Sequence, residues 1–76
     1  MRVYNVELDT SGLNCPLPLL KTKKALAIME SGEVLHVIST DPASVLDLAA
    51  FAAKSGNVLL ESREESGKYY FLLRKA

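Results

Sequence analysis

The stretch Val34-Leu35-His36-Val37-Ile38-Ser39, followed directly by Thr40-Asp41-Pro42, decides the fold of this 76-residue chain. Its first six residues are almost continuously apolar and rich in β-branched side chains, which is typical of a strand in the middle of a sheet. The next three residues place a capping side chain before a proline, and proline is favoured at the first position of a helix. The stretch therefore predicts a central strand that leads into a helix, with Asp41 as the cap of that helix.

The same order of elements occurs earlier in the chain. Residues Val3–Leu8 alternate in polarity and predict a first strand, and the turn residues Asp9–Gly12 follow. A helix is expected over about Pro16–Glu30, with its two prolines in the first turn, where their missing N–H groups are not needed. Gly32 is expected as the C′ residue that ends this helix.

The rest of the chain predicts a second helix over Pro42–Lys54 and two strands, Val58–Glu64 and Lys68–Arg74, joined by a turn at Glu65-Ser66-Gly67. Strand-helix-strand units favour parallel pairing with right-handed crossovers, and the closing hairpin adds an antiparallel pair. The order β-α-β-α-β-β therefore predicts one α+β domain over residues 1–76. We expect a two-layer α/β sandwich in which both helices cover one face of a mixed four-stranded sheet.

Helical periodicity predicts which side chains of the two helices face the sheet. Leu17 and Leu20 are expected to point away from it, and Phe51 falls between the two faces of its helix. The side chains expected in the core are Leu19, Thr22, Ala25, Leu26 and Met29 from the first helix, and Val45, Leu48, Ala49 and Ala52 from the second.

Composition excludes several classes of function. Lys plus Arg and Asp plus Glu balance at 9 each, which argues against strong direct binding of nucleic acid by charge. One cysteine and one histidine do not form a metal-ligand set, and we expect neither a metal nor a cofactor. No apolar stretch approaches the roughly 20 residues that cross a bilayer. The lone cysteine and the lack of a signal peptide predict a cytoplasmic location.

Cys15 is the candidate catalytic residue. It lies between the first predicted strand and the first predicted helix, and a helix N-terminus favours the reactive thiolate form of cysteine. The two strand-to-helix turns are expected at one edge of the sheet, where open α/β sheets tend to bind ligands. Asp41 would raise rather than lower the pKa of a nearby thiol, so a capping role is preferred for it.

Neither a base nor a resolving thiol is visible for Cys15. His36 is expected in mid-strand on the open or partly covered face of the sheet, and no second cysteine exists. A sulfur that takes up and passes on a group needs neither partner. The alternative is a non-catalytic protein- or RNA-interaction module that uses the basic side of the first helix, which carries Lys21, Lys23 and Lys24.

The chain resembles the TusA/SirA family of small sulfur-carrier proteins. The resemblance is carried by Cys15-Pro16-Leu17-Pro18 and extends over almost the whole chain. It also takes in Leu8-Asp9, Gly12, Leu19-Leu20-Lys21-Thr22-Lys23-Lys24, Gly32-Glu33-Val34-Leu35, Ser39-Thr40-Asp41-Pro42-Ala43-Ser44, Asp47, Phe51 and Gly67-Lys68-Tyr69-Tyr70-Phe71.

This resemblance implies the sheet order 1-2-4-3 and a sulfurtransferase-type role in which Cys15 carries a persulfide. The implied partners are a sulfur-donor protein, either a cysteine desulfurase or a rhodanese-like protein, and a sulfur-acceptor protein. The family's pathways include 2-thiouridine synthesis in tRNA, sulfur oxidation, molybdenum-cofactor supply and selenium metabolism. One departure is Ser11, which stands where the family often has arginine.

Overall fold

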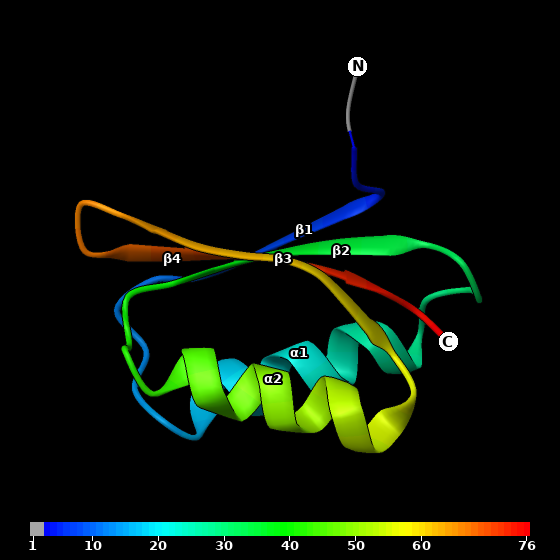
Figure 1. The fold of residues 1–76 in the computed structure, drawn as a ribbon, viewed down its shortest axis with the longest axis horizontal. Coiled ribbons are helices and arrows are strands. Elements are labelled where there is room, and N and C mark those ends of the chain that lie inside the picture. The colour runs from blue at the N-terminus through cyan, green and yellow to red at the C-terminus, as the bar shows by residue number, and fades with distance from the viewer. Residues whose placement is uncertain (1–2) are drawn as a thin grey trace.

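The computed structural model describes residues 3–76 and places both helices on one side of a four-stranded sheet (Figure 1). The strands are β1 (Val6–Thr10), β2 (Val34–Ser39), β3 (Val58–Glu65) and β4 (Lys68–Arg74), and the helices are α1 (Leu17–Ala27) and α2 (Ser44–Ser55). The sheet order is β1-β2-β4-β3, with β1 parallel to β2 and the other neighbours antiparallel. The predicted two-layer sandwich and its strand order are confirmed.

The first strand lies later in the chain than Val3–Leu8. Asn5 occupies the position before it: its N–H donates to the Val34 carbonyl at 2.8 Å, and its side-chain oxygen accepts from the Val34 N–H at 2.8 Å. The side chain thus replaces a strand hydrogen bond. At the other end, Thr10 stays in β1 because it is fully buried and its hydroxyl donates to the Ile38 carbonyl at 2.6 Å.

Helix α1 ends at Ala27, so the predicted end at Glu30 and the C′ role of Gly32 were wrong. Gly32 instead lies in the turn before β2, with φ of +89°, and its N–H donates to the Lys75 carbonyl at 2.9 Å. The Lys75 N–H in turn donates to the Glu33 carbonyl at 2.8 Å. This pairing with the C-terminal segment requires the chain to leave the helix early.

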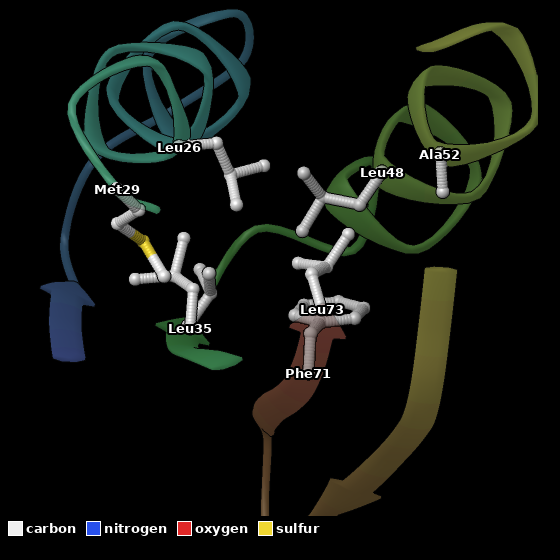
Figure 2. Packing of buried hydrophobic residues seen from close by; sticks show 8 residues of the cluster. Leu26, Met29, Leu35, Leu48, Ala52, Phe71 and Leu73 are labelled. Atoms are coloured by element: carbon white, nitrogen blue, oxygen red, sulfur yellow. The ribbon is translucent and has the colours of Figure 1, made fainter. Parts of the chain in front are cut away.

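The core lies between the helices and the sheet (Figure 2), where Leu26 and Leu48 approach Leu35 and Leu73. Of the predicted helical core residues, Thr22, Leu26, Met29, Leu48 and Ala52 are buried, whereas Leu19, Ala25 and Val45 are half-buried against the core. Ala49 is exposed, which corrects its prediction. Ser44, Leu48 and Ala52 share the buried side of α2 at a spacing of four residues, which turns Ala49 outward.

The last two strands form the predicted hairpin. Its two connecting residues, Ser66 and Gly67, have positive φ values of 51° and 80°, as a type I′ turn requires. Helix α2 ends at Ser55, and the following Gly56 adopts the left-handed conformation with φ of 83°. These local signals predicted β4 to the residue and the end of α2, expected at Lys54, to within one residue.

Candidate functional site

Two strand-to-helix loops meet at one edge of the sheet, as predicted. Thr10 and Ser39, the last residues of β1 and β2, pair directly, so the loops that follow them start side by side. The Gly12 N–H donates to the Thr40 hydroxyl at 2.8 Å, and the Cys15 N–H donates to Asp41 Oδ2 at 2.5 Å. The second loop therefore supports the first loop at the residue that carries the thiol.

Asp41 holds both the thiol-bearing loop and the start of α2. Its Oδ1 accepts from the Ala43 N–H at 3.1 Å, and its carbonyl accepts from the Ser44 N–H at 3.0 Å. Helix α2 begins at Ser44 instead of the predicted Pro42, and its N-cap residue is Ala43. The Asp41 carboxylate therefore accepts from the N–H of the residue before the helix. The prediction that Asp41 caps α2 was therefore wrong, because no side chain makes a capping hydrogen bond at this helix. Asp41 instead supports the turn before α2 and the backbone of Cys15.

Cys15 is a free, exposed cysteine beside Pro16, the N-cap residue of α1. Its Sγ donates a hydrogen bond to Asp47 Oδ2 at a distance of 3.2 Å. Asp47 lies in the first turn of α2, so this second helix delivers an acidic side chain to the thiol. The site therefore combines one thiol with two carboxylates from the opposite loop and helix.

These carboxylates raise the pKa of the Cys15 thiol. The largest cause is the hydrogen bond to Asp47, followed by partial desolvation and by the negative charges of Asp47 and Asp41. The prediction that the helix N-terminus activates Cys15 was therefore wrong. The main physical reason is the contact with Asp47. The first turn also has few N–H groups to oppose it, because Pro16 and Pro18 have none and the Leu17 N–H donates to the Asn14 carbonyl at 2.8 Å.

The three lysines of the first helix do not form one basic patch around Cys15. The Lys23 ammonium lies 5.6 Å from the centre of the Phe51 ring, on the side that faces α2. Lys21 and Lys24 instead line a shallow hollow with Leu8 and Ile28. This division of charge gives no support to an RNA-binding module on α1.

His36 lies on the sheet face opposite the helices, as predicted, because its neighbours Leu35 and Val37 are buried on the helix side. Its Nδ1 atom is 3.5 Å from Glu7 Oε2. Its ring stacks with those of Tyr4 and Tyr70. These contacts place His36 in the sheet surface and leave Cys15 without a histidine base.

Asp47 is the site residue that reasoning from local pattern missed. In the sequence, Asp47 stands out only as one of the residues that carry the family resemblance. The signal was present in the topology: a second helix was expected to begin at the same edge, and an acidic residue in its first turn lies near that edge. Leu17 and Leu20 were placed correctly, since both are exposed on α1 close to Cys15 in the chain.

Within residues 3–76 the structure shows no group of three His, Cys, Asp or Glu side chains arranged to hold a metal ion. None of the helices described is both long and apolar enough to cross a membrane.

Comparisons with known proteins agree with this architecture. The family model described as sulfurtransferase TusA matches residues 6–75. The chain is 59% identical to the sulfur carrier protein TusA of Allochromatium vinosum over 76 residues, which cover 100% of both chains. It is 38% identical to the sulfur carrier protein TusA of Pseudomonas entomophila over 96% of this chain and 91% of that protein. The crystal structure of a SirA-like protein from Desulfitobacterium hafniense superposes with a TM-score of 0.81 at 28% identity, covering 92% of this chain and 96% of that one.

Proposed function

The chain belongs to the TusA family of sulfurtransferases, and from this premise we propose that it carries sulfur as a persulfide on Cys15. The observation that supports this role most directly is the state of Cys15. It is free and exposed at the edge where the two loops meet, and it is the single cysteine of the sequence. With no second thiol in the chain, sulfur taken up by Cys15 has no intramolecular route of escape as a disulfide.

The proposed transfer needs no oxidant. The Cys15 sulfur attacks the outer sulfur of a persulfide on the donor protein, a new S–S bond forms, and the donor S–S bond breaks. The donor cysteine leaves as a thiolate and takes up the proton that Cys15 releases. In the second half of the cycle, a thiolate of the acceptor attacks the outer sulfur on Cys15, and Cys15 leaves.

The partners under this proposal are a sulfur-donor protein, either a cysteine desulfurase or a rhodanese-like protein, and a sulfur-acceptor protein. Two exposed leucines, Leu17 and Leu20, follow Cys15 closely and offer apolar surface for such contacts. We place the relay in the cytoplasm, where thiols stay reduced. One candidate for the pathway that the acceptor protein serves is tRNA thiolation.

Intact mass measurement tests the proposal. The purified protein is incubated with a cysteine desulfurase and cysteine, and we expect a gain of one sulfur atom that a reducing agent removes. The matched control is Cys15→Ser, which differs by one atom and leaves the N–H that donates to Asp41 in place. A gain of the same size in Cys15→Ser, or no gain in the unaltered protein, contradicts the proposal.

A further inference from the structure

The thiol of Cys15 faces negative charge and not positive charge. The Cys15 Sγ atom lies 3.2 Å from Asp47 Oδ2, and the backbone N–H of Cys15 donates to Asp41 Oδ2 at 2.5 Å. An ionised carboxylate has no proton to give, so in the contact with Asp47 the sulfur must be the donor. The contact therefore favours the protonated form of the thiol.

We propose that Asp47 protects the free carrier from small thiols and electrophiles in solution. It keeps Cys15 protonated when the carrier is empty, and it makes the Cys15 sulfur a poor leaving group when the carrier is loaded. This inference deepens the proposed sulfur-carrier function and rests on it. It assigns to Asp47 an effect on both the uptake and the release of sulfur by Cys15.

In the empty carrier, Asp47 lowers the fraction of thiolate. The thiolate is the form that attacks persulfides and disulfides and that is oxidised, so its suppression slows all of these reactions. The hydrogen bond to Asp47 is the largest cause that raises the pKa of Cys15, and the charge of Asp41 acts in the same direction.

In the loaded carrier, the same carboxylate slows the loss of sulfur. Sγ is then bonded to the outer sulfur, and release requires negative charge to develop on Sγ next to Asp47. A thiol with a higher pKa is a poorer leaving group in this exchange. A small thiol from solution brings nothing that neutralises Asp47, so the carried sulfur is retained.

The source of this suppression is visible in the two elements that meet at the site. On the side of α1, Pro16 and Pro18 have no N–H to offer to an anion, and the Leu17 N–H is used by Asn14. On the side of α2, Asp47 places a carboxylate against the sulfur. The usual stabilisation of a thiolate at a helix start is thus weakened by one helix and opposed by the other.

The first experiment measures the rate at which iodoacetamide alkylates Cys15 as a function of pH, in the unaltered protein and in Asp47→Asn. The variant keeps the shape of the side chain and removes its charge. We expect the midpoint of the profile to fall. At neutral pH the rate should rise about threefold for each pH unit of that fall, because a tenfold gain in thiolate is partly offset by weaker nucleophilicity.

Two further variants calibrate this result. Asp41→Asn should move the midpoint in the same direction by less, since the charge of Asp41 is the last of the causes at Cys15. Glu64→Gln is the matched control, because it removes a carboxylate charge from an exposed residue of β3. It should leave the alkylation rate of Cys15 unchanged. A midpoint that stays the same in Asp47→Asn overturns the proposal.

The second experiment loads the carrier and follows the loss of sulfur to reduced glutathione by intact mass. Asp47→Asn should lose sulfur several-fold faster than the unaltered protein, and equal rates contradict the second half of the proposal. Alkylation needs no sulfur donor, so its outcome is independent of whether persulfide forms. If Asp47→Asn does not fold, the unaltered protein is compared with a peptide of residues 11–20, and a midpoint at or below that of the peptide overturns the proposal.

Discussion

The imidazole ring of His36 stacks on the phenol ring of Tyr4, with 4.7 Å between the ring centres and 21° between the planes. The stack continues to Tyr70 at 6.0 Å, and the Arg63 guanidinium covers the next ring face at 4.5 Å. These groups cross the open face of the sheet from the segment before β1 to β3. Because the rings lie against one another, the faces of His36 and Tyr70 are already used, and the row is not a platform for stacking nucleic-acid bases.

Tyr70 is at the centre of this row, between His36 and Arg63. Tyr70→Ala removes contacts with both neighbours, and we expect it to lower the free energy of unfolding by about 1–2 kcal/mol. Tyr70→Phe keeps the ring and should cost less than half of this. Urea denaturation measures both values, and equal losses in the two variants would show that the hydroxyl group and not the stack is responsible.

The buried side of α2 predicts a contrast between two leucines. Leu48 is fully buried, whereas Leu46 is 77% exposed two residues earlier on the same helix. Leu48→Ala should lower the free energy of unfolding by about 2–5 kcal/mol, because it removes apolar contact and leaves a cavity. Leu46→Ala should change it by less than about 0.5 kcal/mol.

Urea denaturation of this matched pair tests the packing. Similar effects in the two variants would contradict the orientation of α2 that also brings Asp47 to Cys15.

Asp41 connects the two loops, and its replacement separates charge from hydrogen bonding. Asp41→Ala removes the acceptor for the N–H groups of Cys15 and Ala43, so we expect a loss of about 1–3 kcal/mol in the free energy of unfolding. Asp41→Asn keeps one acceptor oxygen and should lose less. Amide hydrogen exchange of Cys15 should become faster in Asp41→Ala, and unchanged protection would contradict the contact.

The bounds of helices and strands could be predicted from the sequence where neighbouring residues determine them. β2 and β4 were predicted to the residue, because strand length follows directly from apolar side chains between turn residues. The end of α1 could not be read in this way. It depends on hydrogen bonds of Lys75 with Gly32 and Glu33, which lie far from Lys75 in the chain.

The same distinction applies to the site. The position of Cys15 beside a helix start follows from the local motif, but its environment depends on Asp47, 32 residues later. The helix N-terminus predicts a lower thiol pKa only when its N–H groups are free and no anion is near. Here two prolines reduce the number of free N–H groups, and the second helix brings an anion to the sulfur.

The carboxylates of Glu7 and Asp9, both in β1, predict how the free energy of unfolding varies with pH. The pKa of Glu7 is lowered first by the hydrogen bond from the Tyr4 hydroxyl, at 2.8 Å, and then by His36. The pKa of Asp9 is lowered by hydrogen bonds from the side chain and backbone of Ser11. A carboxyl group with a lower pKa in the folded state stabilises the fold when it is ionised, so this contribution is present above its ordinary pKa and is lost as the pH falls through the folded value.

We therefore expect the free energy of unfolding to decrease as the pH is lowered from 7 through the acid range below about 4.5. Glu7→Gln should flatten this decrease, and Tyr4→Phe should flatten it as well by removing the largest cause of the Glu7 shift. Because both changes remove one interaction, their effects on the pH slope should not add in the double variant. Urea denaturation at a series of pH values gives these slopes, and additive effects would show that Tyr4 and Glu7 act on stability separately.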